Sequence, residues 1–224
     1  MIVTIDGPAG SGKSSTARAF AERLGFHHLE SGALYRGLTL AALRAGVPVE
    51  QWDHLDAAAL GRLAVHAVPA KRAFRVFAGS EDVTAALRDP DVDRNVSRMA
   101  RVPAVRAWLL EQLRAAARNV DLVADGRDMG TVVFPNADVK VFLTANLAAR
   151  ARRRVLEERQ DADPAAVAAE MERLAERDRT DSERTVAPLR PAPDAVHLDT
   201  TDLDFDQQVD AIVALVRERM VSPP

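Results

Sequence analysis

The sequence predicts an α/β fold of three layers, in which a five-stranded, mainly parallel sheet carries helices on both faces. Short apolar segments alternate with longer segments of helical periodicity along most of the 224 residues. The first apolar segment leads directly into a glycine-rich loop, and that loop leads into a helix, within residues 2–24. A strand, a glycine loop and a helix in this order are typical of α/β proteins that bind phosphate groups.

Composition narrows the class of protein further. Hydrophobic residues make up 47% of the chain and charged residues 28%, as in most globular proteins. The net charge is −3, from 30 basic and 33 acidic residues, so we expect no nucleic-acid partner. No apolar run approaches the ~20 residues of a membrane span, so we expect no membrane association. The chain has no cysteine, which excludes disulfides and fits a reducing cytoplasm, the compartment we expect.

The loop between the first strand and the first helix is the strongest signal. Residues 7–15 fit the pattern G-x-x-x-x-G-K-[ST], which lets backbone N–H groups converge on phosphate oxygens at a helix N-terminus. Lys13 would reach the β- and γ-phosphates of a nucleotide, and the Ser14 hydroxyl would bind Mg²⁺. The alternative is an ordinary glycine turn with a solvated Lys13. The candidate phosphate-binding residues are Gly7, Pro8, Ala9, Gly10, Ser11, Gly12, Lys13, Ser14 and Ser15.

The next two elements form a second strand–helix unit. Residues 26–30 are predicted to be a short strand, and residues 33–44 have helical periodicity. Ser31 is the expected N-cap of this helix. Tyr35 and Arg36 lie in its first turns and are candidate site residues. Alternatively, they are a buried aromatic ring and a solvated surface charge.

Residues 47–104 interrupt the alternation of strands and helices. We expect helices near residues 55–65 and 91–99, and short strands near residues 74–77 and 82–84. The segment is too short and too polar to bury a core by itself. It is therefore predicted to be an insertion within a single domain that spans residues 1–224.

An acidic and a basic residue follow the next strand. A helix over residues 103–117 leads into the apolar strand 122–125, which ends in Asp125. This end of the strand lies at the edge where open α/β sheets bind ligands, so Asp125 would support the Mg²⁺ shell of Ser14. Arg127 would face the bound phosphates. Alternatively, Asp125 caps a turn and pairs with Arg127.

The last third of the chain contains an arginine-rich helical pair. Strands are predicted over residues 139–143 and 196–199, and a last helix over residues 205–220. Between them, residues 147–185 are predicted to form two helices that break before Pro164. Arginines on such a pair could close over a transferring phosphate, and a solvated helix face is the alternative.

Four stretches carry a more specific pattern, at residues 5–14, 31–36, 125–135 and 176–184. Together they resemble one known family, the bacterial cytidylate (CMP/dCMP) kinases, nearly from end to end. The phosphate loop alone is shared by many kinases, whereas the last two stretches are far more specific. The resemblance implies a phosphate-loop kinase fold with a CMP-binding insertion at residues 47–104 and a short helical lid at 147–185.

The resemblance also implies a reaction, the transfer of the ATP γ-phosphoryl group to CMP or dCMP in the presence of Mg²⁺. The implied enzyme acts on small nucleotides, and we expect it to be a monomer. The implied catalytic residues are Lys13, Arg127 and Arg184, and the implied metal-binding residues are Ser14 and Asp125. The implied substrate-binding residues are Ser31, Tyr35, Arg36, Ser97, Arg106, Arg127, Asp128, Arg177, Asp181 and Arg184.

Within this substrate-binding set the resemblance implies distinct roles. Arg36, Arg127 and Arg184 would hold the acceptor phosphate and the transferring group. Ser97, Arg106 and Asp128 would read the cytosine. Ser31 and Tyr35 would line the acceptor site, and Arg177 and Asp181 would contact the ribose or close the lid.

Two other functions fit part of the same pattern. A small kinase acting on UMP, AMP or another metabolite would share the scaffold, but residues 125–130 and the insertion argue against it. A GTP-driven switch or an ATP-binding regulatory module would need a base-reading Asn-Lys-x-Asp stretch or a partner surface. Asn146 is followed by Leu147, and no such stretch occurs in the chain.

Overall fold

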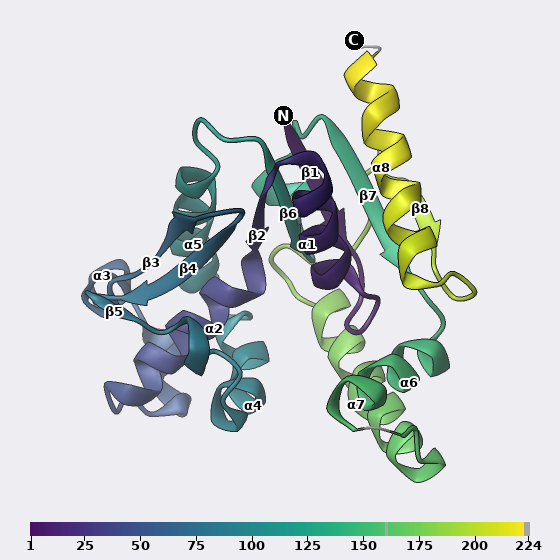
Figure 1. Ribbon diagram of the computed structural model, residues 1–224. Helices are drawn as coiled ribbons and strands as arrows, with labels where there is room; N and C mark the ends of the chain where they lie inside the picture. Colours follow the sequence, from purple (N-terminus) through teal and green to yellow (C-terminus); the bar gives the residue numbers. More distant parts are fainter. Residues whose placement is uncertain (160, 222–224) are drawn as a thin grey trace.

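The computed structural model describes residues 1–159 and 161–221, which form one eight-stranded sheet flanked by helices (Figure 1). The strand order is β3-β4-β2-β6-β1-β7-β8, and β5 pairs with β4. The strands are β1 (Ile2–Asp6), β2 (His27–Glu30), β3 (Val65–Ala70), β4 (Ala73–Ala78), β5 (Glu81–Asp82), β6 (Leu122–Gly126), β7 (Val139–Thr144) and β8 (Val196–Asp199).

Five of these strands form the parallel part of the sheet. The strands β2, β6, β1, β7 and β8 run parallel in that spatial order, with Ile2 opposite Leu122 and Val3 opposite Val139. These are the five strands that the sequence predicts, so the three-layer α/β fold class is confirmed. Parallel strands end at a common edge, which therefore gathers the loops that follow β1, β2 and β6.

The sheet is wider than the predicted five-stranded sheet because three strands of the insertion join it: the two expected near residues 74–77 and 82–84, and β3, which the sequence does not predict. The strands β3 and β4 form an antiparallel pair, and β4 joins β2 through the single pair His28–Ala73. The sequence predicts a helix as far as residue 65, but the helix ends at Leu63 because Ala64 adopts a left-handed conformation with φ of 51°. The strand β3 then forms one edge of the sheet, a position that tolerates Pro69.

The helices closely follow the helical periodicity of the sequence. Asp89, Asn146 and Asp163 each cap a helix by accepting a hydrogen bond from a backbone N–H in its first turn. Ser31 is not an N-cap as predicted, because Glu30 takes that position and Ser31 begins the helix. The helices are α1 (Lys13–Leu24), α2 (Ser31–Arg44), α3 (Ala57–Leu63), α4 (Pro90–Met99), α5 (Pro103–Ala116), α6 (Leu147–Glu158), α7 (Pro164–Ser182) and α8 (Phe205–Val221).

Two apolar clusters cover the two faces of the sheet. One packs α1 and α8 against β1 and β7 and contains Phe20, Val141 and Ile212. The other packs α2 and α5 against the opposite face and also takes in Trp52 and Val76 of the insertion. The insertion therefore shares the main core instead of burying one of its own. Within the described residues, no helix is both long enough and apolar enough to cross a membrane.

The helices α6 and α7 pack against each other below the sheet in the view of Figure 1. A small cluster of Ala9, Ala151 and Leu174 joins both helices to the glycine-rich loop. The contact is polar as well. Arg150 donates to the carbonyl oxygen of Ala9 at 2.8 Å, and the backbone N–H of Ala9 donates to Asp178 at 3.0 Å. Within the predicted lid, residue 160 lies outside the described residues.

Candidate active site

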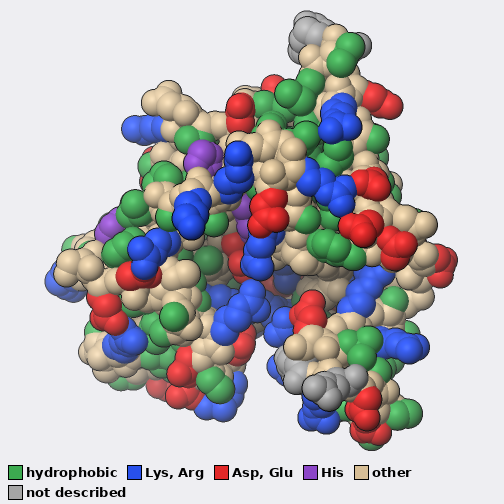
Figure 2. Space-filling model, in the orientation of Figure 1, with side chains coloured by type: hydrophobic (Ala, Val, Ile, Leu, Met, Phe, Trp, Pro, Cys, Tyr) green, Lys and Arg blue, Asp and Glu red, His purple; other side chains and the backbone are tan. Residues whose placement is uncertain are grey.

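A cleft of about 1080 Å³ opens where the loops after β1 and β6 meet the start of α2, which follows β2 directly. Basic side chains gather in the hollow between the insertion, on the left of Figure 2, and α6 and α7, on the right. The cleft is lined by Asp125 and by all ten substrate-binding residues that the resemblance implies. From the loop it is lined by Ala9, Gly10, Gly12, Lys13, Ser14 and Ser15.

The remaining loop residues shape the loop and do not line the cleft. Gly7 has a φ of +151°, and a Cβ atom there would lie 2.0 Å from the carbonyl oxygen of Leu143. Only glycine therefore permits this close approach of the two chain segments. Pro8 accepts hydrogen bonds on its carbonyl oxygen from Ser11 Oγ at 3.1 Å and from Lys13 Nζ at 2.6 Å.

The Lys13 ammonium is buried at the start of α1, with the residue 5% exposed. Its pKa lies well below the usual value because burial and the positive charge of Arg127 disfavour the charged form, although Asp125 and Asp6 oppose this. An anion placed beside Lys13 would relieve both penalties. The loop and the helix N-terminus therefore form an anion-binding site.

Asp125 is held at the end of β6 by several hydrogen bonds. Its Oδ2 accepts from Ser14 Oγ at 2.7 Å, and its Oδ1 lies 2.7 Å from Nε2 of His28. Its backbone carbonyl oxygen accepts from Ser31 Oγ at 2.9 Å. Burial raises the pKa of Asp125, but the contacts with His28, Ser14 and Lys13 outweigh it and keep the pKa below its usual value. The predicted alternative, in which Asp125 pairs with Arg127, is wrong.

Ser14 and Asp125 fit a magnesium ion. They place a hydroxyl and an ionised carboxylate side by side at the cleft, and both are hard oxygen donors. No group of three or more metal-ligating side chains occurs in the part of the chain that the structure describes. Mg²⁺ is usually held by one or two protein carboxylates together with substrate phosphates and water.

Asp6, at the end of β1, fixes the turn that carries Arg127 and Asp128. Its two carboxylate oxygens accept from the backbone N–H groups of Met129 at 2.8 Å and Gly130 at 2.7 Å. Burial raises its pKa to about 6, even though both hydrogen bonds lower it. The phosphate-loop strand therefore sets the position of the loop that follows β6.

Arg127 and Arg184 are brought together on one carboxylate. Arg127 donates from Nε to Oδ2 of Asp181 at 2.7 Å, and Arg184 Nη2 lies 3.0 Å from Oδ1 of the same residue. Burial raises the pKa of Asp181, but the two guanidinium groups hold it below the usual range. The carboxylate of α7 therefore gathers two of the three arginines that the resemblance implies for the acceptor phosphate.

Arg36, the third arginine, lines the same cleft but has different partners. Its guanidinium pairs with Asp93 of α4 and donates to the carbonyl oxygen of Leu87 at 3.3 Å. It is still within electrostatic reach of Arg177, whose pKa it helps to lower. The structure thus places Arg36 on the insertion side of the cleft, whereas Arg127 and Arg184 meet at α7.

A second buried ion pair also lines the cleft. Arg106 of α5 pairs with Asp128, and both side chains are nearly inaccessible to solvent. The guanidinium carbon of Arg106 lies 5.5 Å from the ring centroid of Tyr35. Burial raises the pKa of Tyr35 to about 12, so the phenol stays neutral at physiological pH. Ser97 of α4 lines the same region.

Arg177 has the most strongly lowered pKa of the arginines in this cleft. Burial and the charge of Arg127 lower its pKa to about 10, and Asp181 only partly compensates. Its Nε atom is buried and has no hydrogen-bond partner among the described residues. Like Lys13, it lies where added negative charge would be favourable.

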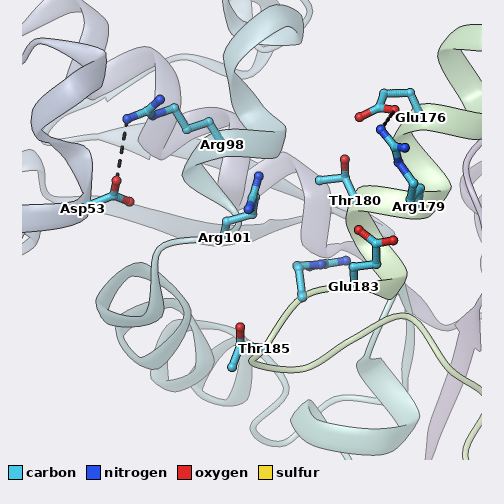
Figure 3. Close-up of a pocket in the computed structure, with 9 residues that line it drawn as sticks. Asp53, Arg98, Arg101, Glu176, Arg179, Thr180, Glu183 and Thr185 are labelled. Atoms are coloured by element: carbon cyan, nitrogen blue, oxygen red, sulfur yellow. Dashed lines mark hydrogen bonds and ion pairs between the residues drawn. The ribbon is translucent and has the colours of Figure 1, made fainter.

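A smaller hollow of about 540 Å³ adjoins the cleft between α7 and the junction of α4 and α5 (Figure 3). Arg98 and Arg101 lie on the insertion side, and Arg98 faces Asp53 at 3.6 Å. Thr180 of α7 and Glu183, which directly follows α7, lie opposite. This hollow shares Glu176, Thr180 and Arg184 with the cleft, so it is a gap between the insertion and α7.

Several residues around the cleft are not anticipated from the sequence. For His28, the sequence shows only that it follows His27 on a strand, so that the two side chains point to opposite faces. Arg150 is expected among the arginines that could close over a phosphate, but it donates to Ala9 and pairs with Asp178. Arg18, Arg88, Asp93, Arg94, Arg154, Glu170 and Arg173 also line the cleft.

A parallel sheet whose first loop has the glycine-rich phosphate-loop pattern and opens into an arginine-lined cleft is the architecture of a phosphate-loop kinase. The sequence profile of the family described as "Cytidylate kinase" matches residues 3–218. This chain belongs to the cytidylate kinase family.

Individual relatives agree with this assignment. A cytidylate kinase of Exiguobacterium sp. is 44% identical over 216 residues, which cover 96% of this chain and 96% of the relative. A cytidylate kinase of Pseudomonas savastanoi pv. phaseolicola is 43% identical over 227 residues, which cover 99% and 97%. A crystal structure of an uncharacterized protein from Eubacterium ventriosum shares the fold alone, with a TM-score of 0.51, 14% identity and coverage of 98% and 99%.

Proposed function

We propose that this chain transfers the γ-phosphoryl group of ATP to CMP or dCMP, giving ADP and CDP or dCDP. One observation carries the proposal: a single cleft contains both the phosphate loop and the buried Arg106–Asp128 pair. Arg127 is within electrostatic reach of Lys13, and Arg184 is within reach of Arg106. Positive charge therefore runs continuously from the loop to the buried pair, as two nucleotides bound end to end require.

The donor would bind at the phosphate loop. Backbone N–H groups of the loop and the N-terminus of α1 would hold the β- and γ-phosphates, with Lys13 beside them. Ser14 and Asp125 would hold Mg²⁺, which when bound neutralises charge on the β- and γ-phosphates. Ser15, which is exposed in the first turn of α1, would lie beside the bound phosphates.

The acceptor would bind between α2, α5 and α7. The N4 amino group of cytosine would donate to Asp128, and its N3 and O2 atoms would accept from Arg106 and Ser97. Arg36, Arg127 and Arg184 would neutralise the acceptor phosphate and the transferring group. Ser31, Tyr35, Arg177 and Asp181 would line the space between the base and the phosphate.

Positioning and charge stabilisation would supply the catalysis. The attacking group is already a phosphate anion, so no residue has to remove a proton from it. Arginines hold both reacting phosphates in fixed places and stabilise the charge that spreads over the transferring group. Water must be excluded, because otherwise ATP would be hydrolysed.

We also propose that α6 and α7 act as a lid over the two nucleotides. Arg127, Arg177 and Arg184 repel one another, so closure becomes favourable when phosphates neutralise them. Closure would narrow the gap of Figure 3 and bring Arg101 toward Glu183 at the C-terminal end of α7. Hydrogen exchange of residues 147–185 should slow when a bisubstrate nucleotide binds, and unchanged exchange would refute the lid.

An acceptor panel tests the reaction itself. ADP release with ATP and Mg²⁺ should be fastest with CMP or dCMP and slow with UMP and AMP. If UMP or AMP were preferred, the protein would be another small kinase on this scaffold. Nucleotide binding without ADP release would instead support a regulatory module.

The setting in which the enzyme works is part of the same proposal. We expect a monomer in the cytoplasm that binds small nucleotides, and no nucleic acid or membrane. Light scattering after gel filtration should give the mass of one chain, 24.3 kDa. A dimer at micromolar concentration would contradict this part of the proposal.

A further inference from the structure

His28 lies beside the carboxylate that is proposed to bind magnesium. Its Nε2 atom is 2.7 Å from Oδ1 of Asp125, and the two side chains are only 5% and 4% exposed. An ionised carboxylate can only accept hydrogen bonds, so the N–H of Nε2 is the donor. This contact is buried and joins residues 97 positions apart in the chain.

The sheet itself brings these two groups together. The strands β2 and β6 are parallel, with Glu30 opposite Asp125. His28 precedes Glu30 by two residues, so its side chain points to the same face of the sheet as that of Asp125. His27 points to the other face, where its ring centroid lies 6.1 Å from that of Phe74. The imidazole is thus placed by a strand and not by a loop.

Hydrogen bonds hold the Asp125 carboxylate at both of its oxygens. Ser14 donates to Oδ2 and His28 donates to Oδ1. The terminal torsion of an aspartate is broad and roughly two-fold, so one contact alone would leave the plane of the carboxylate free to turn. The second contact fixes that plane and directs Oδ2 toward the phosphate loop.

We propose that His28 is a positioning residue for magnesium binding, because it orients Asp125 so that Oδ2 and Ser14 Oγ serve the same ion. This inference rests on the proposed function, since it assumes the magnesium-dependent binding of ATP. His28 touches neither nucleotide in this scheme and acts only through Asp125. Residues that orient a metal ligand in this way typically change metal affinity or activity ~10–100-fold when they are lost.

ATP binding measured by calorimetry with Mg²⁺ and with EDTA, without acceptor, isolates this role. His28→Leu removes the donor and should reduce the magnesium-dependent gain in ATP affinity by about tenfold. Affinity in EDTA and the KM for CMP should stay within about twofold of wild type, a smaller change than the loss of one hydrogen bond produces. His28→Gln keeps an N–H donor of similar reach and should restore most of the gain. His27→Leu, next to it on the opposite face, should leave the gain unchanged.

The outcomes separate this inference from the proposed function. If His28→Leu keeps the full magnesium-dependent gain in ATP affinity of the wild type, only the role of His28 is overturned. A wild-type protein with neither a magnesium-dependent gain nor phosphoryl transfer would overturn both. If His28→Leu fails to fold, the comparison of His28→Gln with His28→Asn replaces it. Only the longer glutamine amide reaches Asp125, so only His28→Gln should keep most of the gain. Equal gains in those two variants would also overturn the role of His28.

Discussion

Arg106 of α5 and Asp128 of the loop after β6 form an ion pair whose side chains are only 6% and 5% exposed. Buried pairs of this kind contribute little net stability, because desolvation offsets the attraction between the charges. The pair borders the cleft, and its carboxylate keeps acceptor capacity for a further donor. Its partner is Arg106 and not Arg127, so Asp128 can present a fixed acceptor to a base.

Asp128→Ala should change which base is accepted. Cytosine offers an N4 amino donor to the carboxylate, whereas uracil offers an O4 acceptor that the carboxylate repels. We expect wild-type kcat/KM to favour CMP over UMP by at least ~10²-fold, because the wrong base leaves buried polar groups unpaired. The variant should narrow that ratio, mainly by losing activity on CMP. An equal loss on both substrates would mean that Asp128 only holds Arg106.

Arg127→Lys should impair phosphoryl transfer strongly. Arg127 uses Nε to bind Asp181, which leaves its terminal nitrogens for phosphate. An ammonium has three donors but no planar fork, so it cannot hold the carboxylate and the phosphate in the same fixed geometry. We expect kcat/KM to fall by ~10²-fold, the loss typical of one electrostatic donor. Arg152→Lys on the exposed side of α6 is the matched control and should leave kcat/KM unchanged, and a similar loss in both variants would contradict the assignment.

Lys13→Met should separate activity from stability. The buried ammonium is disfavoured by desolvation and by Arg127 when no phosphate is bound, so its removal should not lower the free energy of unfolding. Phosphoryl transfer should fall by ~10²–10³-fold, because the charge acts on the transferring group. Urea unfolding and ADP release on the same preparation provide both readouts. Near-normal turnover would remove Lys13 from the mechanism.

Local sequence patterns predict much of this fold. The five parallel strands and the phosphate loop follow from residues that are neighbours in the chain, as at Gly7 and Lys13. The strand β3 is missed because its edge position depends on pairing with β4, which periodicity within residues 65–70 does not reveal.

The pairings within the site are less accessible to sequence. Arg127 meets Asp181 across 54 residues, and only the folded chain decides that Arg36 pairs with Asp93 instead. Strand alternation predicts that His27 and His28 face opposite sides, but the partner of each depends on which strands are neighbours. A list of arginines can thus be predicted, whereas their partners depend on the tertiary structure.

Asp6 should give stability a distinct pH dependence. Its pKa is about 6 in the folded protein and near 3.8 in the unfolded chain. Between these values the folded state holds a proton that the unfolded state has lost, so protonation of Asp6 favours folding. This contribution is complete below pH 3.8 and is lost as the pH rises through about 6.

Asp6→Asn removes this titration and reveals its size. The free energy of unfolding of wild type, minus that of the variant, should increase by about 2 kcal/mol from pH 7 to pH 4, at 1.36 kcal/mol per pKa unit, because the unfolded carboxyl is only partly protonated at pH 4. Taking the difference cancels the titration of Asp125 and Asp181, which both proteins share. Asp202→Asn, an exposed carboxylate without a hydrogen bond from its side chain in the described residues, should show no such trend. Urea unfolding at several pH values measures all three proteins. A difference that is independent of pH would show that Asp6 is ionised in the folded state at pH 4.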